Sequence, residues 1–115
     1  MGSDRDLTRT EIPPGTLYML ILRSLARLGP MHGYGIAQHI QLLSEDVLQV
    51  EEGSLYPALQ RMLIKGWVTA EWRQTENNRR ARYYRLTAAG KKQLSVEMSE
   101  FDKVTRAITN VIQPA

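Results

Sequence analysis

The 115-residue sequence contains no cysteine, and this absence excludes a disulfide framework and any metal site built on thiolates. Only two histidines occur, His32 and His39, and no further set of metal ligands is recognisable around them. The sequence therefore predicts no metal, and a reducing cytoplasm is the expected location.

Long apolar runs are absent as well. The longest candidate, residues 17–28, is interrupted by Arg23 and Arg27 and is shorter than the roughly 18 residues that a membrane span needs. The N-terminal segment has no apolar core and does not resemble a signal peptide. We expect no contact with a membrane.

Catalytic motifs are also missing. The sequence has no phosphate-binding glycine loop and no G-x-S-x-G elbow. Glu51 and Glu52 are adjacent carboxylates, but a solvated approach to a helix explains them. The two histidines fit a surface or packing role. We predict that the protein is not an enzyme and needs no cofactor.

Positive charge is present and is concentrated in one place. The net charge is +3, yet five arginines lie within 13 residues beside one acid, Glu76. These arginines are Arg73, Arg79, Arg80, Arg82 and Arg85. Such a concentration is typical of a nucleic-acid partner, although a charge run can also be a solvated surface.

Apolar spacing predicts three helices in the first two thirds of the chain. The first follows the Pro-Pro-Gly sequence at 13–15, with Thr16 as N-cap, and ends at Gly29. Tyr18 and Leu22 form a second apolar edge on it, which we expect to contact another element or another subunit. The second helix lies within residues 31–45. The core positions of the three helices are Leu17, Leu20, Ile21, Leu25, Leu28, Ile36, Ile40, Leu43, Leu55, Leu59, Met62 and Leu63.

The third helix carries a proline near its start. With Ser54 as N-cap, Pro57 is the third helical residue, where a missing N–H has no intrahelical partner. Gly66 ends the helix.

After this helix the period of the pattern changes to two. Residues 67–75 and 80–87 predict a β-hairpin that turns at Asn77 and Asn78. Trp67 and Trp72 are expected in the core.

Thr87 is the predicted N-cap of a last helix of about 25 residues, which spans roughly 37 Å. Its apolar residues recur at heptad spacing, and the stripe is longer than a small domain needs for its own core. Pairing with the same helix of a second copy is the favoured interpretation, and folding back onto its own domain is the alternative. The stripe consists of Leu94, Met98, Phe101, Val104, Ile108 and Val111.

The order of elements is that of a winged helix-turn-helix, a mainly α (α+β) fold with a two-stranded β-wing and, here, a long C-terminal helix. We expect a flexible arm at residues 1–13, a DNA-binding domain at 14–87 and a dimerisation helix at 88–115. On the outer face of the third helix, Gln60 can pair with adenine, Arg61 with guanine, and Ile64 can pack on a thymine methyl group. A solvated helix face explains the same residues without DNA.

The chain resembles the PadR family of bacterial transcriptional regulators, in its short form with a single C-terminal helix. The matching pieces are GTLYMLILRSL (15–25), HGYGIAQHI (32–40), GSLYPALQRM (53–62), GWV (66–68) and RARYYRLTAAGKKQL (80–94). The resemblance implies a dimeric repressor in which Ser54 and Tyr56 meet the DNA backbone. It places Tyr18, His32 and Tyr34 near the DNA surface or in helix packing. Many members release DNA on binding phenolic compounds or drugs.

The expected partners are a pseudo-palindromic DNA duplex, a second copy of the chain, and a small aromatic or hydrophobic effector whose binding residues are not assigned. A winged helix that binds protein or RNA is the alternative. The predicted DNA contacts are Tyr34, Ser54, Tyr56, Pro57, Gln60, Arg61, Lys65, Arg79, Arg80 and Arg82. The predicted dimer contacts are the stripe of the last helix together with Tyr18 and Leu22.

Overall fold

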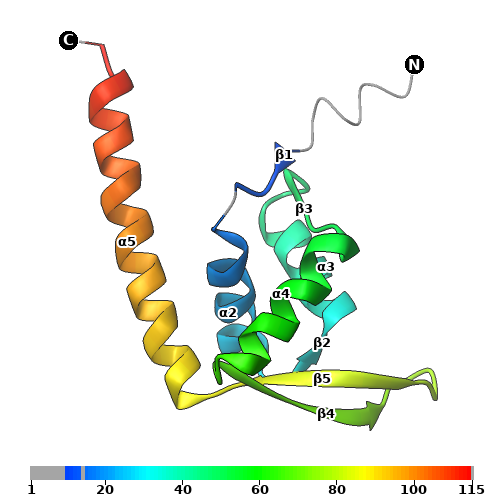
Figure 1. Cartoon of the computed structure of the whole chain (residues 1–115). Helices are drawn as coiled ribbons and strands as arrows, with labels where there is room; N and C mark the ends of the chain where they lie inside the picture. The colour runs from blue at the N-terminus through cyan, green and yellow to red at the C-terminus, as the bar shows by residue number, and fades with distance from the viewer. Residues whose placement is uncertain (1–9, 14, 115) are drawn as a thin grey trace, which may run out of the picture.

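Three helices form the body of the molecule, a β-hairpin extends from one end of the body, and a long helix stands beside it (Figure 1). The computed structural model of the protein describes residues 10–13 and 15–114. The elements are β1 (Thr10–Glu11), α2 (Leu17–Leu28), β2 (Met31–His32), α3 (Gly33–Leu43), β3 (Leu48–Gln49), α4 (Glu52–Ile64), β4 (Val68–Gln74), β5 (Arg80–Leu86) and α5 (Ala88–Ile112). No helix among the described residues is long and apolar enough to cross a membrane.

The mixed α+β winged-helix architecture confirms the predicted fold class. Helices α2, α3 and α4 pack around one core, and β4 and β5 form the wing. The largest fully buried side chains are Ile21, Leu22, Ile36, Leu55, Leu59, Met62 and Val68. Leu22 is thus part of the core of its own domain, so it is not available for the predicted contact with a second subunit.

Two short strands, β1 and β2, were not predicted from the sequence. Strand β2 pairs with β5 and gives a three-stranded sheet in the order β2-β5-β4. Strand β1 pairs in parallel with β3, with Thr10 opposite Leu48 and Glu11 opposite Gln49. Residues 10 and 11 are therefore held in a sheet and do not belong to a free arm. Residues 1–9 of the predicted arm, as well as residues 14 and 115, lie outside the described residues.

Helix α4 begins earlier than predicted. Glu51 is the N-cap, and its carbonyl accepts the N–H groups of Ser54 at 3.0 Å and Leu55 at 2.9 Å. Ser54 is consequently the third helical residue and Pro57 the sixth, so the predicted N-cap was wrong. Because Pro57 has no N–H, the carbonyl of Gly53 receives no bond from the residue four positions ahead. The missing hydrogen bond lies on the exposed side of the helix.

The far end of α4 connects to the start of α5. Gly66, with φ of 77°, donates its N–H to Leu63, and Trp67 donates to Met62 at 3.0 Å, which is a Schellman arrangement. Thr87 caps α5 as predicted, because its hydroxyl accepts the N–H of Gly90 at 3.0 Å. The same hydroxyl donates back to the carbonyl of Gly66 at 2.7 Å. The two helix ends are therefore fixed against each other.

Beyond its first two turns, α5 has an exposed apolar stripe. Leu94 is 7% exposed and belongs to the core, so it does not serve the predicted contact with a partner. The other predicted members of the stripe are 43% exposed or more. These are Met98, Phe101, Val104, Ile108 and Val111.

Candidate nucleic-acid interface

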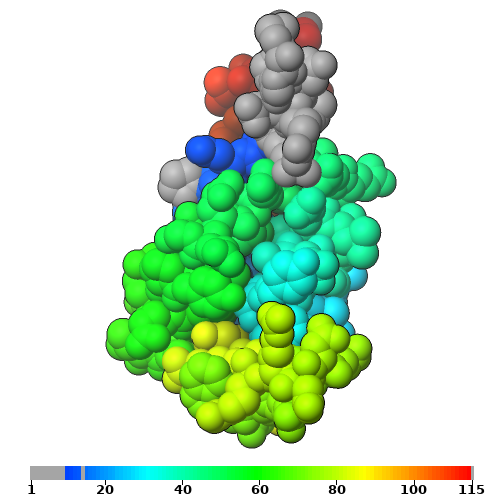
Figure 2. All heavy atoms as spheres, turned by 90° about the vertical axis from the view of Figure 1, so that its right-hand side faces the viewer, coloured from blue at the N-terminus to red at the C-terminus, as the bar shows by residue number. Residues whose placement is uncertain are grey.

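The start of α3, the outer side of α4 and the hairpin lie on the same side of the molecule. Figure 2 views this side and shows α4 and α3 next to each other, with the hairpin across the end of both. The side chains predicted to contact DNA all belong to these elements and are all exposed. They are Tyr34, Ser54, Tyr56, Pro57, Gln60, Arg61, Lys65, Arg79, Arg80 and Arg82.

Tyr56 joins α4 to the beginning of α3. Its ring lies over Gly33, where a Cβ atom would stand only 2.8 Å from the ring. A residue larger than glycine at position 33 would push the tyrosine out of this place. Tyr56 also lies close enough to the buried phenol of Tyr84, on β5, to influence its pKa, which is raised above the ordinary value of 10.0 mainly by burial. Tyr56 is 45% exposed, so one part of its side chain is held against the domain and the other part is accessible to a ligand.

Helix α3 is capped by a histidine, which the sequence analysis did not identify. Nδ1 of His32 accepts the N–H of Gly35 at 3.0 Å, so the ring proton belongs on Nε2. The ring of His32 stacks against that of Tyr34, with the two centroids 6.5 Å apart. Tyr34 is 65% exposed, and its hydroxyl accepts a hydrogen bond from Gln38. An exposed hydroxyl at a helix N-terminus is well placed for an anion such as a phosphate.

The register of the hairpin divides its side chains between two faces. Trp72 stands opposite Arg82, and Gln74 stands opposite Arg80, so these residues share a face with the buried Val68 and Tyr84 of the same strands. We call this the body-facing side of the wing, and it consists of Val68, Ala70, Trp72, Gln74, Arg80, Arg82, Tyr84 and Leu86.

Trp72 does not belong to the core. It is 58% exposed, and it lies in the wing, which extends past the body of the molecule. The guanidinium group of Arg80 instead lies over it, 5.3 Å from the ring centroid. The prediction that both tryptophans are core residues was therefore wrong for Trp72, whereas Trp67 is half-buried and packs against the core.

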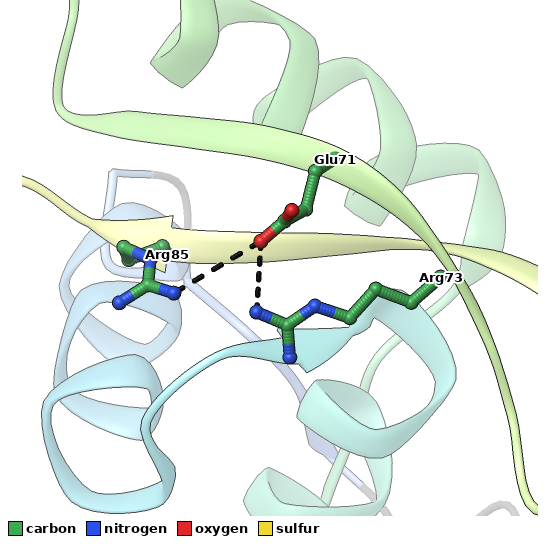
Figure 3. A network of polar contacts seen from close by, with 3 residues as sticks. All are labelled: Glu71, Arg73 and Arg85. Carbon is green, nitrogen blue, oxygen red and sulfur yellow. Dashed lines mark hydrogen bonds and ion pairs between the residues drawn. The ribbon is translucent and has the colours of Figure 1, made fainter.

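The outer side of the wing contains the other two strand arginines. There Glu71 accepts a hydrogen bond from Arg73 at 2.8 Å, and Arg85 lies 3.9 Å from the same oxygen (Figure 3). The hydrogen bond and charge of Arg73, with a smaller effect from Arg85, hold the pKa of Glu71 below its ordinary value of 4.5. The strand arginines are therefore two groups. Arg73 and Arg85 pair with Glu71, whereas no carboxylate of the described residues forms an ion pair with Arg80 or Arg82.

Arg61 lies on the margin of α4 that faces away from Tyr56. The five-residue separation places the two side chains about 140° apart around the helix, with Gln60 between them. Nε of Arg61 donates a hydrogen bond to the hydroxyl of Tyr18 on α2. Tyr18 is thus occupied within its own domain, although the sequence analysis assigned it to a dimer contact.

The chain is similar to known regulators over most of its length. The sequence profile of the transcriptional regulator PadR-like family matches residues 21–96. A protein of Lysinibacillus sphaericus described as "uncharacterized protein X" is 30% identical over 102 residues, which cover 89% of this chain and 93% of that protein.

Solved structures show the same fold. A transcriptional regulator from Clostridium thermocellum has 25% identity and a TM-score of 0.78, over 86% of this chain and 95% of that one. A PadR family transcription regulator from Clostridium difficile has 28% identity and a TM-score of 0.71, over 85% and 99% of the two chains. The chain therefore belongs to the PadR-like family of transcriptional regulators.

Proposed function

We propose that the protein is a sequence-specific repressor that binds a pseudo-palindromic DNA duplex in the cytoplasm as a homodimer. One observation carries the proposal. The exposed polar face of α4 adjoins Arg80 and Arg82 on the body-facing side of the wing, which form no ion pair with a carboxylate of the described residues. A helix for the major groove and a cationic hairpin for the backbone therefore lie on one surface.

The position of each side chain suggests its role on DNA. Gln60 and Ile64 lie on the central outward face of α4, where an amide can pair with adenine and an apolar group can pack on thymine. Arg80 and Arg82 can contact phosphates or a narrow minor groove. Tyr56, fixed over Gly33, can donate its hydroxyl to a phosphate.

A selection experiment tests the DNA-binding function. The purified protein is incubated with random duplexes, bound sequences are amplified, and affinity for the selected duplex is measured across salt concentrations. We expect a pseudo-palindromic site and a log–log salt slope of about −0.9 for each phosphate neutralised. Binding that ignores salt, or that prefers single-stranded RNA, would contradict the proposal and favour the RNA or protein alternative. Repression is tested by placing the selected site between a promoter and a reporter gene.

The apolar stripe of α5 supports the homodimer. Four of its residues, Met98, Phe101, Val104 and Ile108, are 43–53% exposed, and their spacing places them along one side of the helix. A second copy of α5 is the simplest cover for such a line. Phe101→Asp should give a monomer in sedimentation velocity, whereas the matched change Lys103→Asp, on the same helix but outside the stripe, should leave the dimer intact. An unchanged dimer in the Phe101 variant would contradict the assignment.

A cavity of about 330 Å³ between α2 and α5 supports release by an effector. Its lining is mainly apolar and includes Met19, Val96, Phe101 and Val104. This volume is within the range of small-ligand sites, so we propose a small aromatic or hydrophobic compound as the effector. Screening such compounds for release of the selected duplex tests the site. Met19→Trp should fill the cavity and abolish release while the protein still binds DNA.

A further inference from the structure

The two cations on one margin of α4 each lie against an aromatic ring. The guanidinium carbon of Arg61 is 5.8 Å from the ring centroid of Tyr18, and Nζ of Lys65 is 5.2 Å from that of Trp67. The two rings in turn contact each other edge to face, with centroids 5.8 Å apart and planes at 84°. The four side chains therefore form one connected row, which we call the cation–aromatic row.

The row is fixed at both of its rings. Tyr18 is a residue of α2, which is packed into the body of the molecule. The backbone of Trp67 is held by its own N–H, which donates to Met62, and by its carbonyl, which accepts the N–H and the hydroxyl of Thr87. Tyr18 is thus attached to α2, and Trp67 is attached to the end of α4 and to the N-cap of α5. The cations, by contrast, are exposed, with Arg61 in the last turn of α4 and Lys65 as its C-cap.

The hydrogen bond to Tyr18 leaves most of the arginine free for another ligand. A guanidinium group has five N–H donors, and Nε uses one of them on the Tyr18 hydroxyl. Among the residues that the structure describes, no acceptor is found for its terminal nitrogens. Such a group is oriented but not neutralised, because a phenol hydroxyl and a ring face carry no full negative charge. Holding a long side chain in its bound conformation reduces the entropy lost on binding.

The spacing of the two cations fits a phosphate backbone. Arg61 and Lys65 are four residues apart, which corresponds to a rise of about 6 Å along the helix. Successive phosphates follow one another along a DNA strand, so two cations one helical turn apart can contact neighbouring phosphates. The margin position of Arg61 also directs it to the side of a groove and away from the base edges that Gln60 faces.

We propose that Tyr18 and Trp67 are positioning residues that hold Arg61 and Lys65 as a pair of phosphate-binding cations. This assigns Arg61 to the DNA backbone, whereas its chemistry alone would also permit a contact with guanine. The inference rests on the proposed DNA-binding function and adds the residues that set the geometry of two contacts.

A double-mutant cycle tests the positioning role. Affinity for the selected duplex is measured for wild type, Tyr18→Phe, Arg61→Ala and the double variant. Tyr18→Phe keeps the ring and removes the hydroxyl, and it should weaken binding about threefold to tenfold. The same change in the Arg61→Ala background should have an effect below about twofold, because the group that the hydroxyl positions is gone. Equal effects in both backgrounds would overturn the role of Tyr18.

The class of contact is tested on a panel of duplexes. Arg61→Ala should weaken every duplex by a similar factor and lower the salt slope by about 0.9 for each half-site. A loss of preference at one base position with an unchanged slope would instead assign Arg61 to a base and overturn the phosphate role. For the other ring, Trp67→Phe should retain most of the affinity and Trp67→Leu should not. Equal affinity of these two variants, at equal thermal stability, would overturn the role of Trp67.

Two controls separate this inference from the function on which it depends. Tyr83→Phe removes a hydroxyl from the outer side of the wing and should leave DNA binding unchanged. Sedimentation of each variant checks that the dimer persists. If wild type binds no duplex, the proposed function itself fails. If wild type binds and the cycle is additive, only the positioning role fails.

Discussion

The two faces of the wing contain the same kind of residue in different electrostatic surroundings. On the outer side, Arg73 and Arg85 share the carboxylate of Glu71. On the body-facing side, Arg80 lies over the ring of Trp72, and no carboxylate of the described residues forms an ion pair with it. A cation that already has a carboxylate partner gains less from a phosphate than one that has none. If the wing binds DNA as proposed, we expect the position of an arginine along the strand, more than the number of arginines, to decide which of them contact phosphates.

Removing both arginines from one face should have the largest effect. We expect Arg80→Ala with Arg82→Ala to weaken duplex binding by at least about tenfold, because two charge-assisted contacts are lost. The salt slope should fall by about 1.8 for each half-site. The matched pair Arg73→Ala with Arg85→Ala removes the same charge from the other face and should change affinity by less than about threefold. If the two double variants lose the same amount of duplex affinity, measured by fluorescence anisotropy, then both faces of the wing contribute equally to binding.

The next largest effect is expected at the hairpin turn, which sets the register between β4 and β5. Asn78 has φ of 63°, and its side-chain oxygen accepts a hydrogen bond from Gln74 at 2.7 Å. Alanine disfavours this left-handed conformation, so Asn78→Ala should lower the free energy of unfolding by about 1 kcal/mol. Asn78→Gly removes the strain and should recover most of that loss in a denaturant titration. If the two variants are equally stable, the positive φ is not what matters at this turn.

The ring beneath Arg80 should have a smaller effect. Trp72→Ala removes a cation–π contact at an exposed site and should weaken duplex binding by about threefold. Trp72→Phe retains an aromatic face and should stay close to wild type. Because Trp72 is outside the core, the midpoint of thermal unfolding should change little in either variant. A large drop in that midpoint would show that the ring stabilises the fold.

The smallest effect is expected from the carboxylate on the outer face. The pKa of Glu71 is lowered in the folded protein by Arg73, so its ionised form favours folding. This contribution is present above the unfolded pKa and is lost as the pH falls through the lower folded value. Thermal midpoints of wild type and Glu71→Gln should therefore differ slightly near neutral pH and converge in acid. Duplex affinity should stay within about twofold, unless the outer face also contacts DNA.

The sequence was sufficient for the helices and the hairpin but insufficient for the faces of the wing. Periodicity and turn residues located the helices, the hairpin and its turn, because each of these signals is local. The wing was different, since Tyr83 and Tyr84 are adjacent and either could have been the buried one. The burial of Tyr84 in the structure decides which parity faces the body, and with it the side on which Arg80 and Arg82 lie.

The other predictions that were wrong or missing also concern features that a local sequence pattern does not reveal. Strand β2 is two residues long and offers no alternation to detect. The residue type of Ser54 favoured it as the N-cap. The carbonyl of Glu51 accepts the first hydrogen bonds of the helix, however, so the N-cap lies three residues earlier. Leu94 lies in the apolar stripe of α5, yet it is close enough to the body to be buried there. The cap formed by His32 depends on a ring orientation that no spacing rule reports.

One glycine fixes the direction in which α5 leaves the body. A Cβ atom on Gly90 would lie 2.1 Å from the carbonyl oxygen of Trp67, so no other residue fits there unless the helix swings away. In the proposed dimer, the angle between α5 and the body sets the distance between the two α4 helices. That distance must match one turn of duplex, about 34–36 Å, or a multiple of it. In that dimer we expect Gly90 to help set the spacing of the half-sites, and a larger residue there should select half-sites with a different separation.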